Sequence, residues 1–114
     1  MNEKFIKSLY KTVVTDGIKA YQDLLENTDC RNATDRYWIS ILELYGQLSS
    51  EEKEKMLKFA ELIIIDTISS VMGIFDGSST LSGGALEFDI KINGIDTANE
   101  LQDAFLEYIE EITT

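Results

Sequence analysis

Carboxylates are the side chains of this chain with the clearest capacity for chemistry or recognition, and their most ordered group lies near the C-terminus. Five of them fall within about 100° of one helical surface, counting 3.6 residues per turn; they are Glu100, Asp103, Glu107, Glu110 and Glu111. Asp103–Glu107 and Glu107–Glu111 are like charges four residues apart, and each such pair destabilises a helix by a few tenths of a kcal/mol. We call these five residues the acidic stripe.

The acidic stripe belongs to a wider charge asymmetry. Residues 1–58 contain ten acidic and nine basic residues, whereas residues 59–114 contain eleven acidic residues and a single basic one, Lys91. The second half therefore carries a net charge of −10 out of a total of −11. Such a surface repels phosphate backbones, so we expect no nucleic-acid partner.

Three interpretations of the acidic stripe follow from its chemistry. It can be a solvated face that aids solubility. It can pair internally with Lys4, Lys7 and Lys11, which form a cationic stripe on the first predicted helix. It can also dock a basic protein, because acidic surfaces steer and orient basic partners.

A second polar group lies within an otherwise apolar segment. Asp66, Ser69, Ser70 and Gly73 follow the spacing of one helical face and form a narrow polar strip. We interpret it as a solvent-facing or close-packing strip, with a polar site on the central helix as the alternative. If Asp66 is partly buried there, it is the carboxylate best placed for acid–base chemistry.

The chain contains no histidine, which excludes the histidine-based nucleophiles and most common zinc sites. It also has no glycine-rich phosphate-binding fingerprint. The spacing from Asp89 to Glu100 resembles that of an EF-hand calcium loop, but Lys91 places a cation where an oxygen ligand belongs. We therefore expect no metal, no cofactor and no catalytic residue, and we do not expect an enzyme.

Hydrophobic periodicity predicts four helices in a single domain covering residues 1–114. The first, second and fourth span about residues 2–27, 33–48 and 97–112, and the third runs from the Ser49 capping box to the segment that begins at Asp76. Asn32 or Thr34 is expected to cap the second helix, and capping boxes are expected to begin the third helix at Ser49 and the fourth at Thr97. The third helix is apolar over most of its circumference, which predicts a buried central helix.

The second helix has a broad apolar arc that we expect to be buried. It consists of Tyr37, Trp38, Ile41, Leu42, Leu44, Tyr45 and Leu48. The fourth helix has a narrower core face, made of Leu101, Ala104, Phe105, Tyr108, Ile109 and Ile112. Burial of such faces is the usual source of helix stability in a globular domain.

A small β element is expected around residues 78–93, as a hairpin or as a single strand packed on the helices. Apolar and polar residues alternate after Gly84, from Leu86 to Asn93, which is typical of a half-buried strand. Gly83-Gly84 is a plausible two-residue hairpin turn, and Asn93-Gly94 is expected to form a tight turn before the last helix. The predicted fold class is mainly α, with this minor β element.

The remaining features predict an intracellular environment. Cys30 is the only cysteine, so no internal disulfide can form, which fits a reducing compartment. No window has the roughly 20 apolar residues that a membrane span needs, and the first residues lack the apolar segment of a secretory signal. We therefore expect a cytoplasmic, soluble protein without a membrane partner.

These observations favour a small acidic protein-interaction module, such as an inhibitor or immunity-type protein, that docks on a basic protein. Immunity proteins and antitoxins share this size, charge and helicity, and the comparison rests on general character alone. The alternative is a structural or homo-oligomeric protein whose hairpin edge or apolar helix faces pack against a second copy. A carboxylate-based enzyme acting through Asp66 is a third hypothesis.

Overall fold

The computed structural model describes residues 1–32, 34–84 and 86–113, and it confirms a mainly helical fold with a small antiparallel hairpin. The elements are α1 (Asn2–Leu9), the π-helix η1 (Tyr10–Thr15), α2 (Asp16–Asn27), the short 3₁₀ helix η2 (Cys30–Asn32), α3 (Arg36–Gln47), α4 (Ser50–Asp76), β1 (Lys91–Ile92), β2 (Ile95–Asp96) and α5 (Leu101–Thr113). None of the helices in these ranges is both long and apolar enough to cross a bilayer.

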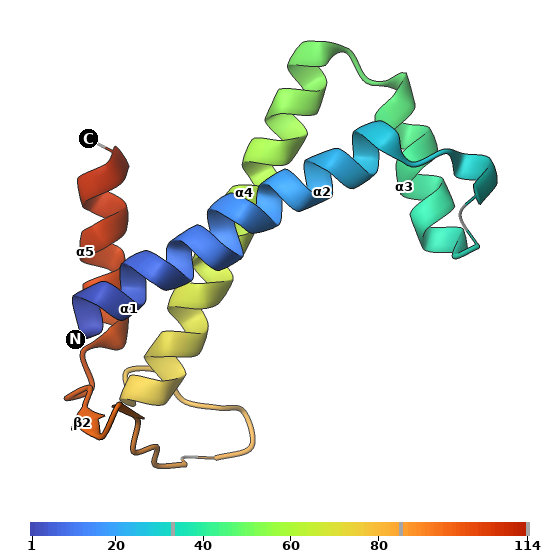
Figure 1. Cartoon of the computed structure of the whole chain (residues 1–114). Coiled ribbons are helices and arrows are strands. Elements are labelled where there is room, and N and C mark those ends of the chain that lie inside the picture. The colour runs from blue at the N-terminus through green and yellow to red at the C-terminus, as the bar shows by residue number, and fades with distance from the viewer. Residues whose placement is uncertain (33, 85, 114) are drawn as a thin grey trace.

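Two long rods define the architecture. The first is the continuous run α1–η1–α2, which crosses α4 near the middle of the molecule (Figure 1). At one end α5 lies beside α1, and at the other end α3 lies beyond the crossing (Figure 1). We call the α5 end the base and the α3 end the tip.

The first rod agrees with the helix predicted over residues 2–27, except for its π-helical centre. A π-helix bonds residues five apart, and this spacing brings the Lys11 Nζ atom within 2.6 Å of an Asp16 carboxylate oxygen. Val14, on the same π segment, is buried. The widened turn therefore lies where the two rods cross, just before Gly17.

The main core lies at the base, between α1, α4 and α5. Its buried residues are Ile6, Met72, Leu101 and Phe105. The Tyr10 and Tyr108 rings meet edge to face beside them, with their centroids 5.5 Å apart. This packing confirms Leu101 and Phe105 as core residues of the last helix, whereas Ile112 is exposed.

The tip has a much smaller core. On α3 only Leu42 and Tyr45 are buried, so most of the apolar arc predicted to be buried is not. Tyr37 and Leu44 are exposed. The cap prediction was also wrong, because Asp35, and not Asn32 or Thr34, accepts hydrogen bonds from the first amides of α3. The predicted first residue of this helix, Ala33, lies outside the described residues.

The third predicted helix is correct in its position but not in its burial. Ser49 Oγ accepts a hydrogen bond from the Glu52 amide at 3.1 Å, and Glu52 Oε1 accepts one from the Ser49 amide at 2.8 Å, so the predicted capping box is confirmed. The helix ends at Gly77, whose φ of 83° is the left-handed conformation that glycine adopts readily. Only Met72 and Gly73 are buried along its 27 residues, so α4 is not a buried central helix.

The β element forms later in the chain than the Gly83-Gly84 turn would have placed it. Lys91 pairs with Asp96 and Ile92 with Ile95, around a turn at Asn93-Gly94. Both turn residues have positive φ, at 52° and 81°, as the tight hairpin turn with the best strand twist requires. The Gly83-Gly84 hairpin is therefore a wrong prediction, and the Asn93-Gly94 turn is a confirmed one.

The last helix begins at Leu101, and the capping box predicted at Thr97 is absent from it. Thr97 is buried, and its hydroxyl donates to the Ile90 carbonyl at 3.0 Å instead of capping a helix. The cap comes from α4, because Asp76 Oδ2 accepts a hydrogen bond from the Gln102 amide at 2.6 Å. The end of one helix therefore fixes the beginning of another.

Replacing Asp76 by alanine is expected to lower the free energy of unfolding by about 1–2 kcal/mol, because it removes an acceptor from the first turn of α5. Chemical denaturation of the two purified proteins gives this value directly. Asp66→Ala is the matched control, since Asp66 is an exposed carboxylate on the same helix, and it should change stability by less than about 0.5 kcal/mol. Equal effects of the two substitutions would contradict the capping role.

The molecule is unusually open for its length. Its radius of gyration is 17.6 Å, whereas a compact domain of this length has about 13 Å. The long dimension measures 48 Å and the short one 23 Å. The two rods diverge from their crossing, so apolar helix faces remain uncovered on both sides of it.

Candidate interaction surfaces

All five residues of the acidic stripe are exposed on α5 and on the residue before it. The apolar side of α5 packs on α1 and α4, and this packing turns the opposite side of the helix outward. Glu100, Asp103, Glu107, Glu110 and Glu111 thus lie on the solvent-facing side of the helix, where a solvated face or a docking surface would place them. No basic residue lies within α5 to neutralise them along the helix.

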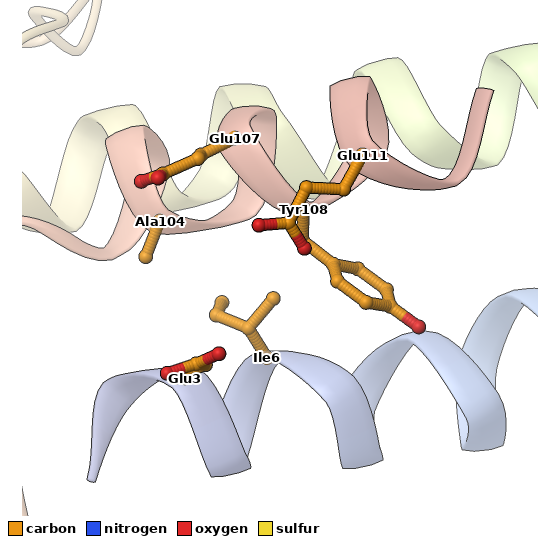
Figure 2. A pocket seen from close by; sticks show the side chains of 6 residues that line it. All are labelled: Glu3, Ile6, Ala104, Glu107, Tyr108 and Glu111. Carbon is orange, nitrogen blue, oxygen red and sulfur yellow. The ribbon is translucent and has the colours of Figure 1, made fainter. Parts of the chain in front are cut away.

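A small groove lies between α1 and α5, beside the acidic stripe (Figure 2). It has a volume of about 150 Å³, and its lining residues are Glu3, Ile6, Ala104, Glu107, Tyr108 and Glu111. Ile6 and Ala104 face each other between the two helices, and the three carboxylates surround them (Figure 2). An apolar floor within a ring of carboxylates suits the long stem and charged head of a lysine or arginine. We call this site the acidic groove.

Two of the lysines on the first rod have ion-pair partners on that same rod. Lys7 Nζ lies 3.4 Å from Glu3 Oε1, and Lys11 Nζ lies 2.6 Å from Asp16 Oδ1. Both are exposed pairs of the kind that contributes about 0–1 kcal/mol. Glu3 brings a carboxylate from α1 to the acidic groove, and no pattern in the sequence had pointed to it.

The predicted polar strip on α4 divides into two parts. Asp66 and Ser70 are exposed, so the partial burial expected for Asp66 is not found. Ser69 instead contacts α5, where its carbonyl and its hydroxyl accept hydrogen bonds from Gln102 Nε2 at 3.0 and 3.4 Å. A side chain on Gly73 would meet the same amide, since a Cβ built there lies 2.7 Å from Gln102 Nε2. Ser69 and Gly73 thus serve close packing.

Two apolar grooves lie on either side of the rod crossing, and neither was predicted from the sequence. The tip groove has a volume of about 300 Å³, and its lining residues are Ile18, Tyr21, Leu25, Trp38, Ile41, Met56, Leu57, Ala60, Ile63 and Ile64. The base groove has a volume of about 450 Å³, and its lining residues are Phe5, Leu9, Thr67, Ile68, Val71, Met72, Phe75, Ile90, Lys91, Ile92 and Leu101. The sequence feature that could have indicated these grooves is the apolar circumference of α4. It shows that other side chains should cover the helix, but not whether those side chains belong to the same chain.

The open shape leaves more surface exposed than a folded monomer of this mass normally has. The accessible surface is 8239 Å² for a chain of 12.9 kDa. A compact protein of that mass has an accessible surface of about 6300 Å². The difference is roughly 1900 Å². Contiguous apolar patches beyond a few hundred Å² usually mark interaction sites in soluble proteins.

Among the described residues no group of three or more Cys, Asp and Glu side chains is arranged to hold a metal ion. The Asp89–Glu100 segment forms the hairpin and the turn that leads into α5, and Lys91 Nζ lies 3.6 Å from Asp89 Oδ2 within it. No protein-family model, curated protein or solved structure matches the chain.

Proposed function

We propose that this chain is a protein-interaction module, of the inhibitor or immunity type, that docks a basic protein on the acidic side of α5. The single observation that carries the proposal is the acidic stripe, exposed along a helix that contains no basic residue. A basic partner would neutralise these carboxylates on binding, and their field would speed the encounter.

The acidic groove supports the proposal with a feature that a solubilising face does not need. Its floor is apolar, and its carboxylates come from two helices, with Glu3 on α1 and Glu107 and Glu111 on α5. A lysine or arginine of the partner would bury its aliphatic stem against Ala104 and the ring of Tyr108. The groove thus offers an anchor for one cationic side chain at the centre of a broader charged contact.

The local energetics of α5 favour the same interpretation. Asp103 and Glu107 are exposed like charges at i and i+4, an arrangement that costs a helix a few tenths of a kcal/mol. A cationic side chain of a partner bound at these two carboxylates would relieve this repulsion.

Reversing the charge of Asp103, Glu107 and Glu110 to lysine together is expected to abolish binding of the basic partner and to leave the fold intact. The three residues are exposed, so their replacement removes no core contact. The measurement is capture from an extract of the native host by the immobilised chain, at salt concentrations of about 50 mM and about 500 mM. The wild type should retain a basic protein at low salt and release it at high salt.

A control with the same change of charge separates a specific site from general electrostatics. Asp23, Glu43 and Asp66 are exposed carboxylates on α2, α3 and α4, and their reversal to lysine alters the net charge equally. This control should still capture the partner. Loss of capture in both variants, or in neither, would argue against docking on α5.

A second candidate function is favoured by a separate observation. The accessible surface of 8239 Å² exceeds that of a compact monomer by roughly 1900 Å². This excess supports a homo-oligomeric protein, since packing against a second copy is the commonest way to cover such surface. The two candidates are compatible, because the acidic stripe is at the base and the tip groove is at the opposite end.

A further inference from the structure

We propose that a second copy of this chain covers the tip groove, so that the protein is a two-fold symmetric dimer joined at its tips. Such a dimer does not depend on the docking of a basic partner at α5. The tip is weak as an isolated unit, because Leu42 and Tyr45 are the buried residues of α3. Around them Tyr21, Ile41 and Ile63 line the groove and are exposed.

The area to be covered favours a copy of the same chain. The excess of roughly 1900 Å² per protomer is shared between the tip and the base; if the tip accounts for about half of it, a dimer would bury about 1900 Å² in total, near the lower end of the range of about 2000–5000 Å² that obligate homodimers bury. A small ligand in a groove of about 300 Å³ would leave most of this surface exposed. Obligate homodimer interfaces are also the most apolar class, as the lining of this groove requires.

Charge selects the tip over the base as the contact between copies. Residues 16–58, which include α2, α3 and the first turns of α4, contain nine acidic and six basic residues and have a net charge of −3, whereas residues 1–15 and 59–114 together have −8. Two copies joined at their bases would bring together two strongly acidic ends. Two copies joined at their tips place the less acidic ends in contact and keep the strongly acidic ends apart.

Charges near the tip also suit a self-complementary contact. Lys53 and Lys55 lie among Glu51, Glu52 and Glu54 at the start of α4, so both signs are present within one patch. In a two-fold interface the same patch of both copies is in contact, so each residue lies opposite a different residue of the other copy's patch. Because the patch contains both signs, a lysine of one copy can lie opposite a glutamate of the other. A strongly basic partner, by contrast, would gain less from this end than from the more acidic base.

The test is the molar mass of the purified full chain, measured by sedimentation equilibrium from about 1 to about 100 µM. The wild type should have twice the mass of 12.9 kDa. Ile63→Lys should raise the dimer dissociation constant at least ~100-fold, because it places a charge in the groove of both copies. Ile41→Lys, on α3, should act in the same direction, and far-UV circular dichroism checks that each variant remains helical.

Val71→Lys is the matched control, since Val71 also lies on α4 but lines the base groove. The two side chains are similarly exposed, at 49% for Ile63 and 42% for Val71. The control should remain dimeric, and so should the charge-reversed variant of Asp103, Glu107 and Glu110. The proposal would be overturned if the wild type had a mass of 12.9 kDa at about 100 µM. It would also be overturned if Val71→Lys lost the dimer while Ile63→Lys kept it.

Discussion

Replacing Phe105 by alanine should lower the free energy of unfolding by about 3–4 kcal/mol, a large fraction of the stability of a small domain. Phe105 is 0% exposed, and it packs with Ile6, Met72 and Leu101 where α1, α4 and α5 meet. Its removal would leave a cavity at the junction that holds the base together. Denaturant unfolding followed by circular dichroism measures the change.

The neighbouring residue provides the control for this prediction. Leu106 is apolar and lies on the same helix, but it is 47% exposed. Leu106→Ala should therefore cost less than about 1 kcal/mol, and alanine's higher helix propensity offsets part of that. A loss from Leu106→Ala as large as that from Phe105→Ala would show that the packing of α5 differs from the one described.

Replacing Tyr45 by alanine should detach α3 from α2 and α4 and leave the base folded. Tyr45 is 2% exposed, and its hydroxyl donates a hydrogen bond to a Glu26 carboxylate oxygen on α2. The ammonium of Lys53 lies 4.7 Å from the centre of its ring, so the side chain joins α2, α3 and α4. Burial, together with the hydrogen bond to Glu26 and its negative charge, raises the pKa of Tyr45 to about 12, so the hydroxyl is a donor at neutral pH.

The measurement for Tyr45→Ala is amide hydrogen exchange along α3. The loss of about 3 kcal/mol of local stability should speed exchange there by roughly 100-fold, with little change in α1 and α5. Tyr45→Ala and the parent protein with which it is compared should both carry Ile63→Lys, so that association at the tip does not contribute to the exchange rates. Tyr37→Ala is the control, because Tyr37 is 86% exposed on the same helix. Similar exchange in the two variants would contradict the bridging role of Tyr45.

Local sequence signals predicted those parts of the fold that local interactions determine. The Ser49–Glu52 capping box requires only neighbouring residues, and it is found as predicted. The Asn93-Gly94 turn is likewise local, since both of its residues tolerate positive φ. The start of α5 depends instead on Asp76, which is 26 positions from Gln102, and no local pattern could reveal it.

Burial was the property that the sequence could not assign. The periodicity of α4 indicates correctly that its side chains prefer to leave water, but it does not say which chain supplies the covering surface. The acidic stripe was located from the sequence because exposed charges repeat along one helical face. The acidic groove was not, because Glu3 and Glu107 are brought together only by the packing of α1 on α5.

Fluorescence-detected sedimentation velocity in an extract of the native host tests most directly whether this chain works in association with other proteins. Sedimentation velocity reports mass and shape together, so the elongated outline of the molecule does not imitate a larger particle. We expect the labelled wild type to sediment as a species of at least twice 12.9 kDa, and as a still larger one while a basic partner is bound. A single elongated species of 12.9 kDa would contradict both proposed associations.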